Sequence, residues 1–324
     1  MKVLVRADGG GAVGWGHLGR CAALADVLDA CGVDVQWACR ASDAVTRLVG
    51  RPPDVPLPGP PTMDRLPAEE ADALATVAAD ADWLVIDHYG ADVPYLEAIR
   101  RHTNARILLV DDHQHREGAD LRLAPTQSPA PNTLTGAHFQ LVHRCFSRAP
   151  QGLAREGWLI ALGGADPRDD MARCLGAIGD LAPLTVLASD RIAARQDLDT
   201  LLATRKGPCT RIAWLEPEDL AVTLATSTAA LVSASTLVWE AMATRTPVVA
   251  LQTADNQCGV VDTLRSVGTP VFTDALAAAE ALRLGLAALA PPDARLDGKG
   301  AWRVAKAMGV DADWSHELTS ESDS

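Results

Sequence analysis

The chain has no Cys-x-x-Cys pair, because its seven cysteines are scattered along the 324 residues. Scattered cysteines at apolar positions argue against a disulfide framework and favour buried thiols in a reducing, cytoplasmic compartment. The chain also has no apolar run of about 18 residues, the length that a membrane-spanning helix needs. Its apolar start is only a strand long, since Arg6 and Asp8 interrupt it. We therefore expect neither a signal peptide nor a membrane partner.

Clustered positive charge is missing as well. The formal net charge is -13, and no block of lysines or arginines stands out. Because phosphate backbones need clustered positive charge, we expect no nucleic-acid partner, although local cations can still bind one anionic metabolite. Apolar residues make up 48% of the chain. That composition is globular, and the length suits two domains of about 150 residues each.

The sequence has no Gly-Lys-Ser/Thr motif, which excludes a P-loop. The glycine-dense stretch 9–19 fits Gly-x-Gly-x-x-Gly twice, but a dinucleotide fingerprint also needs an acidic residue at the end of the second strand. That strand ends at Arg40, and Asp34 comes too early. Nicotinamide binding is therefore a minor hypothesis, and we expect no cofactor.

Apolar β-rich runs alternate with helical periodicity along the chain, which predicts parallel sheets with right-handed crossovers. The pattern lapses near residues 126–156 and then repeats the opening order of strand, glycine turn and helix. We expect a Rossmann-like domain at 1–149, a second at 150–313, a polar tail at 314–324 and a proline-rich loop at 51–67. The predicted strands are 2–5, 33–39, 83–86, 107–110, 158–162, 184–187, 211–214, 229–232 and 248–251.

Ligands of open α/β sheets bind beyond the carboxyl ends of the strands, and two facing sheets make a cleft. His17 is the first candidate, because it follows a glycine turn at the mouth of a helix and can exchange a proton near neutral pH. It could instead cap the helix or contact a phosphate. Asp87 could orient His17 or cap the next helix, and Tyr89 could contact a sugar. Arg20, one helical turn after His17, could contact a phosphate or a sugar.

The second half has its own candidates. Ser235 and Thr236 lie where a strand gives way to a helix, so hydroxyls and helix N–H groups there suit a pyrophosphate. The alternative is an ordinary N-cap serine with Glu240 on the surface. Gly163 and Gly164 would let the backbone approach the diphosphate.

Three further stretches follow predicted strands. Backbone groups at Trp214 and Leu215 could read a base, although Trp214 could also belong to the core. Asn256 and Gln257 could contact sugar or phosphate. Residues 111–115 carry metal-type ligands, but consecutive residues do not converge on an ion, so we expect a loop of solvated charges and no metal.

These motifs resemble the PseG family, the UDP-sugar hydrolases of pseudaminic acid synthesis, within the GT-B group that includes the murein GlcNAc transferase. The matching residues, in chain order, are Arg6, Asp8, Gly14, Gly16, His17, Arg20, Asp87, His88, Tyr89, Asp112, Gly163, Gly164, Asp166, Ser235, Thr236, Glu240, Asn256 and Gln257.

The resemblance implies an α/β GT-B architecture, two Rossmann-like domains whose parallel sheets face each other across a cleft. It implies that His17 assists a water that attacks the anomeric carbon and expels UDP with inversion. Asp87 and Tyr89, which follow a buried strand, are counted with His17 as catalytic candidates. The resemblance also implies that Glu240 accepts both ribose hydroxyls. The substrate-binding residues would be Arg6, Asp8, Gly14, Gly16, Arg20, His88, Gly163, Gly164, Trp214, Leu215, Ser235, Thr236, Glu240, Asn256 and Gln257, without a metal.

One segment departs from the family pattern. Residues 139–148 lack the tyrosine and the glutamate of a Tyr-x-Leu-Leu-Arg-x-Glu-Phe-like run, and glycines at 9–11 replace serine-like residues. Two alternatives to a hydrolase therefore stay open. One is a GT-B glycosyltransferase with a small-molecule acceptor in place of water, and the other is a non-catalytic protein that binds nucleotide sugars.

Overall fold

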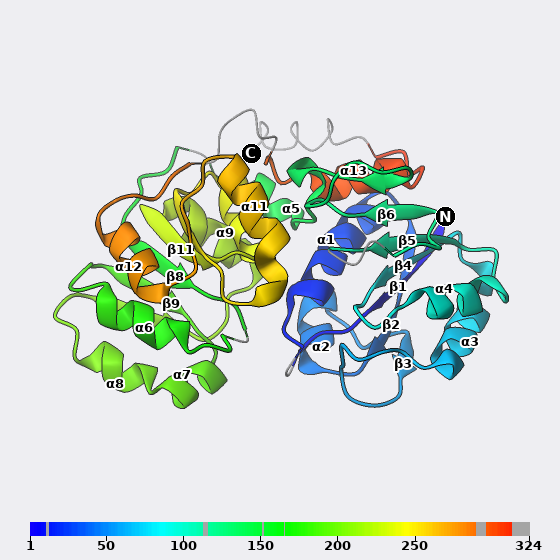
Figure 1. Ribbon diagram of the computed structural model, residues 1–324, viewed down its shortest axis with the longest axis horizontal. Coiled ribbons are helices and arrows are strands. Elements are labelled where there is room, and N and C mark those ends of the chain that lie inside the picture. Colours follow the sequence, from blue (N-terminus) through cyan, green and yellow to red (C-terminus); the bar gives the residue numbers. More distant parts are fainter. Residues whose placement is uncertain (11–12, 113–115, 151, 165, 290–295, 313–324) are drawn as a thin grey trace, which may run out of the picture. The chain divides into compact units, whose positions relative to one another are not determined.

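A computed structural model of the chain divides into two compact units, each built on one sheet (Figure 1). No helix in its described part is long and apolar enough to cross a membrane. It describes residues 1–10, 13–112, 116–150, 152–164, 166–289 and 296–312. The first unit takes its described residues from 1–11, 17–144 and 299–324, and the second from 12–16 and 145–298.

The first sheet has seven strands in the order β3-β2-β1-β4-β5-β6-β7, all paired in parallel. On one face, Leu74 of α3 and Leu96 of α4 belong to the same buried cluster as Ile86 of β4. The elements of this unit are β1 (Lys2–Ala7), α1 (Gly16–Ala30), β2 (Asp34–Arg40), α2 (Asp43–Val49), β3 (Val55–Leu57), α3 (Ala68–Val77), η1 (Ala78–Asp80), β4 (Trp83–Asp87), α4 (Val93–Arg100), β5 (Arg106–Val110), β6 (Leu121–Leu123), β7 (Thr133–Leu134), η2 (Ala137–Phe139) and α13 (Gly300–Ala307).

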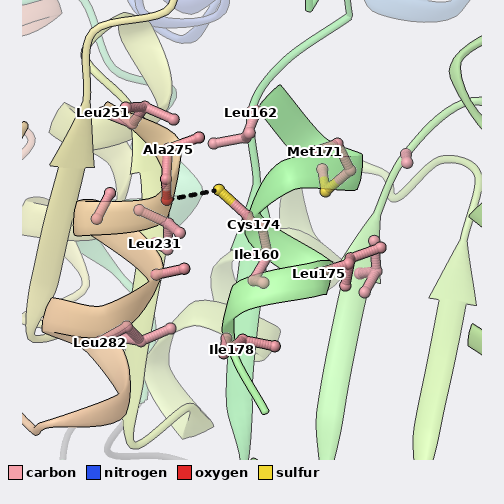
Figure 2. Packing of buried hydrophobic residues seen from close by; sticks show 14 of the residues in the cluster. Ile160, Leu162, Met171, Cys174, Leu175, Ile178, Leu231, Leu251, Ala275 and Leu282 are labelled. Carbon is pink, nitrogen blue, oxygen red and sulfur yellow. Dashed lines mark hydrogen bonds between the residues drawn. The ribbon is translucent and has the colours of Figure 1, made fainter. Parts of the chain in front are cut away.

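The second sheet has six parallel strands in the order β10-β9-β8-β11-β12-β13. Helices α6 and α12 bury their apolar faces on it, and Figure 2 shows the Cys174 thiol pointing at the Ala275 carbonyl, 3.5 Å away. The elements that follow the first unit in the chain are α5 (Arg144–Ser147), β8 (Trp158–Ala161), α6 (Asp170–Ala177), β9 (Leu184–Leu187), α7 (Asp190–Gln196), α8 (Leu198–Ala203), β10 (Cys209–Ile212), α9 (Pro217–Thr226), β11 (Ala229–Ser233), α10 (Thr236–Ala243), β12 (Val248–Leu251), η3 (Asp255–Gln257), α11 (Cys258–Ser266), β13 (Val271–Phe272) and α12 (Ala275–Arg283).

The proline-rich stretch 51–67 is not wholly the loop that its composition predicts. It contains β3, which pairs in parallel with β2 through Ala38 and Val55. Pro56 is tolerated there because β3 is the edge strand and has a neighbour on one side only. Strand β10 also begins and ends two residues before the predicted range 211–214.

Helix α13 belongs to the first unit, whereas the sequence places residues 150–313 in one domain. The Trp83 indole of β4 donates to the Met308 carbonyl at 3.0 Å, just beyond the helix. Arg303 donates to the His138 carbonyl at 2.9 Å. At Gly300 a Cβ atom would lie 1.9 Å from the Gln140 carbonyl oxygen. Only glycine therefore allows α13 to pack this closely.

The variant Gly300→Ala should lower the free energy of unfolding by about 1 to 3 kcal/mol, because the helix has to move away from residue 140. Chemical denaturation measures this. The control is Gly176→Ala on the exposed side of α6, where no atom lies near the added Cβ and alanine should stabilise by about 0.5 to 1 kcal/mol. Equal unfolding free energies in the two variants would contradict the close approach.

Candidate functional site

Three neighbouring strands of the first sheet end beside one another. Strand β1 lies next to β4, with Ala7 opposite Asp87, and β4 lies next to β5. Helix α1 begins after β1 and carries His17 in its first turn, Asp87 is the last residue of β4, and Asp112 follows β5. The parallel sheet thus gathers side chains that are distant in the sequence.

The His17 ring and the Asp87 carboxylate form a short hydrogen bond. His17 Nδ1 lies 2.6 Å from Asp87 Oδ1, and both side chains are at least nine-tenths buried. An ionised carboxylate only accepts hydrogen bonds, so the Nδ1 atom carries the proton. In the neutral ring the lone pair then lies on Nε2, which has no hydrogen-bond partner among the described residues. Of the two predicted roles for Asp87, orienting His17 is the one that this contact fits.

Arg20 keeps the Asp87 carboxylate ionised. Burial alone would raise the pKa of Asp87, but Arg20 and His17 together hold the pKa well below its usual range. The Arg20 guanidinium donates from Nε and NH2 to the two carboxylate oxygens, with NH2 2.7 Å from Oδ1. Its NH1 donates to Asp112 Oδ2 at 2.7 Å. Arg20 is therefore engaged by two carboxylates of its own chain.

Tyr89 lies against the same histidine. The two rings meet edge to face, with 4.5 Å between centroids and an interplanar angle of 87°. The Tyr89 hydroxyl lies 3.5 Å from Asp112 Oδ2. The structure thus brings together all three residues predicted to be catalytic, His17, Asp87 and Tyr89.

Arg6 and Asp8 lie in the interior instead of facing a ligand, because both side chains are fully buried. Arg6 Nε donates to Glu70 Oε1 at 2.8 Å, and its NH1 lies 2.9 Å from Asp8 Oδ1. Arg40 donates to Asp8 at 2.7 Å and to Glu70 at 2.5 Å, and the Tyr95 hydroxyl donates to Glu70 at 3.1 Å. Two arginines and two carboxylates balance one another in this buried charge network.

His88 points into the same interior. Its Nδ1 accepts from the Gly90 amide at 2.9 Å, and its Nε2 donates to the Thr62 carbonyl at 2.6 Å. Nε2 also lies 3.5 Å from Asp8 Oδ2. His88 therefore fixes the turn that carries Tyr89, and both ring nitrogens are already used.

Asp111 is not the solvated charge that the sequence predicts. It is fully buried, and its carboxylate accepts from the Arg116 backbone amide at 2.6 Å. Arg116 in turn donates to the carbonyls of His88 and Ala91, both at 2.8 Å. This pair clamps the turn after β4 because buried carbonyls need donors. Residues 113–115 lie outside the described residues.

The variant Asp8→Asn should lower the free energy of unfolding at neutral pH by about 3 to 5 kcal/mol, because it leaves two buried arginines short of one negative charge. The network holds the pKa of Asp8 below its usual range against the effect of burial, which raises it. The stability that Asp8 contributes is therefore present above the unfolded pKa, near 4, and is lost as the pH falls towards the folded pKa.

The measurement is denaturant unfolding at neutral pH and near pH 3, where the gap between wild type and Asp8→Asn should narrow. Asp72→Asn is the control, since its carboxylate is 59% exposed and lies 3.6 Å from His102. A gap that is constant with pH, or no larger than in the control, would refute the network's role.

In the second unit, the ends of β8 and β11 meet in the same way, since the two strands are neighbours. A Cβ atom on Gly163 would lie 3.7 Å from the Ser233 hydroxyl, and Ser233 and Ser235 share a hydrogen bond of 2.7 Å. Ser235 precedes α10, yet no side chain of the described residues caps this helix. The Val238 N–H donates to the Ser235 carbonyl at 3.2 Å, so the N–H groups that could meet an anion are those of Thr236 and Leu237.

Helix α6 is different, because a carboxylate of the chain already occupies its N-terminus. Asp166 accepts from the amides of Asp170 and Met171, both at 3.0 Å, and from Gln196 at 2.6 Å. Of the two helices that follow β8 and β11, α10 is therefore the one that offers an open anion site.

Glu240 lies one turn into α10 and is half-buried. Its carboxylate has no hydrogen-bond partner among the described residues, and desolvation raises its pKa to about 7. A ligand hydroxyl that donated to this carboxylate would supply the missing partner.

Two further candidates of the second unit, Trp214 and Gln257, make contacts within the chain. The Trp214 indole N–H donates to Glu216 at 3.0 Å, and its ring stacks on Trp15 with 4.4 Å between centroids. The Gln257 side chain forms hydrogen bonds within its own loop, where its Oε1 atom accepts from the Thr253 backbone amide at 2.8 Å. Asn256 is exposed in that loop.

Leu215 is half-buried just after β10. Gly14 adopts a φ of 82° in the loop before α1. A Cβ atom on Gly16 would lie 3.6 Å from the Thr236 hydroxyl, and one on Gly164 would lie 3.0 Å from the Trp15 ring. The approach is close at Gly164, whereas the separation at Gly16 is that of an ordinary van der Waals contact.

The predicted site leaves out Asp112, although it contacts Arg20 and Tyr89. Asp112 could have been predicted from the sequence, because it lies just after β5, a strand that neighbours β4. Glu70 gives no such signal, because it lies in the helix α3 and only the fold brings it to Arg6.

Comparison with known proteins gives a structural likeness only. No protein-family model matches the chain, and no curated protein does. Acinetobacter baumannii MurG superposes with a TM-score of 0.60 at 15% identity, covering 95% of this chain and 99% of that one. The S. aureus MnaA–UDP structure gives 0.64 at 12%, covering 96% and 98%. The UDP-GlcNAc 2-epimerase of Neisseria meningitidis, bound to UDP-GlcNAc, gives 0.63 at 11%, covering 95% and 99%.

The chain has the GT-B fold. The two Rossmann-like units with parallel sheets that the sequence predicts are thereby confirmed. At these identities the likeness establishes the fold alone.

Proposed function

We propose that this protein hydrolyses a UDP-linked amino or deoxy sugar, cleaving the anomeric C–O bond and releasing UDP and the free sugar. The observation that carries the proposal is the His17–Asp87 hydrogen bond of 2.6 Å, which leaves the Nε2 lone pair to act as a base. The resemblance of the motifs to the PseG family supports this choice among GT-B reactions.

In the proposed reaction, Nε2 of His17 takes a proton from water as the water oxygen bonds to the anomeric carbon. The bond from that carbon to the diphosphate oxygen breaks, and its electron pair leaves with UDP. Asp87 stabilises the imidazolium that forms, as the carboxylate of a catalytic triad does. The configuration at the anomeric carbon inverts, because water attacks opposite the leaving group.

The second unit would bind the nucleotide. The uncapped N-terminus of α10, with Ser235 and Thr236, would hold the diphosphate, and Glu240 would accept the ribose hydroxyls. Solved structures with this fold contain UDP and UDP-GlcNAc, which supports a uridine nucleotide as the probe. Backbone dipoles would stabilise the charge on the departing diphosphate without a metal.

The experiment is incubation of the purified protein with a panel of UDP-sugars in oxygen-18 water, followed by mass spectrometry. One labelled oxygen in the sugar and none in UDP is the expected result. Label in UDP would mean attack at phosphorus and would overturn the mechanism.

The departure of residues 139–148 from the PseG pattern favours a second candidate, a glycosyltransferase. It predicts that UDP appears only after an acceptor is added. Binding of UDP-sugars without turnover under any condition would instead indicate a non-catalytic binding protein.

The variant His17→Asn should lower kcat by about 10² to 10⁴-fold, the usual contribution of a general base, while KM changes little. Steady-state release of UDP measures both constants. His102→Asn is the control, because His102 is 55% exposed and lies 3.6 Å from Asp72. Turnover by His17→Asn at the wild-type rate would remove His17 from the reaction.

UDP affinity should rise by up to about tenfold between pH 6 and 8, because Glu240 ionises across this range and its carboxylate is the better acceptor. Isothermal titration calorimetry measures the dissociation constant of UDP. In Glu240→Gln the affinity should be weaker and should lose this rise, whereas Glu280→Gln, an exposed change on α12, should keep it. The same pH dependence in Glu240→Gln would show that the carboxylate does not bind the ribose.

A further inference from the structure

Arg20 has little capacity left for a substrate. Its Nε and NH2 donate to Asp87 and its NH1 donates to Asp112, and its side chain is only 17% exposed. Three of the five guanidinium N–H groups therefore already donate to carboxylates of the chain, and little of the side chain faces solvent. The interactions thus point away from the phosphate or sugar contact that the sequence predicts.

Asp112 holds Arg20 from the side opposite Asp87. Its Oδ2 atom accepts from Arg20 NH1 at 2.7 Å and lies 3.5 Å from the Tyr89 hydroxyl. The Asp112 side chain is 26% exposed, so it tolerates substitution better than the buried Asp87. The Arg20 guanidinium thus binds two carboxylates, those of Asp112 and Asp87, and the Asp87 carboxylate also contacts His17.

We propose that Arg20 and Asp112 are positioning residues that set how readily the His17 ring accepts a proton. Arg20 acts both through Asp87 and directly, because its NH2 lies 2.7 Å from Asp87 Oδ1 and 3.2 Å from His17 Nδ1. This inference rests on the proposed function of His17 as a base. The Arg20 charge opposes a second positive charge on the ring, and the Asp112 charge offsets part of that opposition. A base works best when its protonation midpoint lies near the working pH.

The charged and titratable groups around this site come from four segments. Arg20 and Cys21 belong to α1, and the Cys21 thiol lies 3.6 Å from Asp87 Oδ2. Asp87 ends β4, Tyr89 follows it, and Asp112 follows β5. Removing the Arg20 charge should therefore raise the midpoint of the His17 titration, whereas removing the Asp112 charge should lower it.

The experiment follows the His17 ring by NMR against pH in the full chain, without substrate. Arg20→Met, which removes a positive charge beside the ring, should raise the midpoint, and Asp112→Asn, which removes a negative charge nearer to solvent, should lower it by less. Arg20→Lys keeps the charge and should restore the midpoint towards the wild-type value. Shifts of the same sign in Arg20→Met and Asp112→Asn would overturn the proposal.

Arg100→Met is the matched control. Arg100 also pairs with an aspartate, Asp120, at 2.6 Å, but it lies on the exposed end of α4. Its loss should leave the His17 midpoint unchanged. A shift in this control as large as in Arg20→Met would also count against the proposal.

Turnover of a UDP-sugar provides the second readout. In each variant the acidic limb of the plot of kcat against pH should move in the same direction as the NMR midpoint. KM should stay within about threefold of the wild-type value, because neither residue is proposed to contact the substrate. A higher KM in Arg20→Lys with an unmoved limb would assign Arg20 to the substrate instead. If the wild type shows no turnover, the proposed function fails, and the NMR titration still decides this proposal.

Discussion

The hydrogen bond between His17 and Asp87 is the interaction on which the first unit's chemistry depends. An ionised carboxylate next to Nδ1 fixes the tautomer, and the tautomer decides which nitrogen can act as a base. Keeping that carboxylate ionised in a buried place needs a counter-charge, which Arg20 supplies. The site is thus a small set of charges in which each member needs the others.

Other buried residues of the first unit hold the backbone segments that carry these charges. The buried charge network of Arg6, Asp8, Arg40 and Glu70 fixes the strand that leads into the glycine loop. Arg116 clamps the turn that carries Tyr89. In the second unit the division is between α6, whose N-terminus Asp166 fills, and α10, whose N-terminus stays open.

The sequence predicted the parallel strands and the place of His17, Asp87 and Tyr89, because strand ends and glycine turns are local patterns. It misplaced what depends on distant partners. In the sequence, Arg6 interrupts an apolar strand. In the fold, Glu70 of helix α3 supplies the counter-charge that allows Arg6 to be buried. Helix α13 follows the second unit in the chain, but it packs on residues of the first unit such as Trp83 and Gln140, more than 150 residues earlier. Asp111 follows a strand, where the sequence predicts a solvated charge, but its carboxylate is buried and accepts a hydrogen bond from the Arg116 backbone amide.

The most direct measurement is the nitrogen-15 NMR spectrum of the His17 ring at neutral pH, which reports the proton on each nitrogen. For the neutral form of the ring, we predict the proton on Nδ1 and the lone pair on Nε2, and a loss of this preference in Asp87→Asn. A neutral ring with its proton on Nε2 in the wild-type protein would contradict the account, because the nitrogen that has to accept a proton from water would already be occupied.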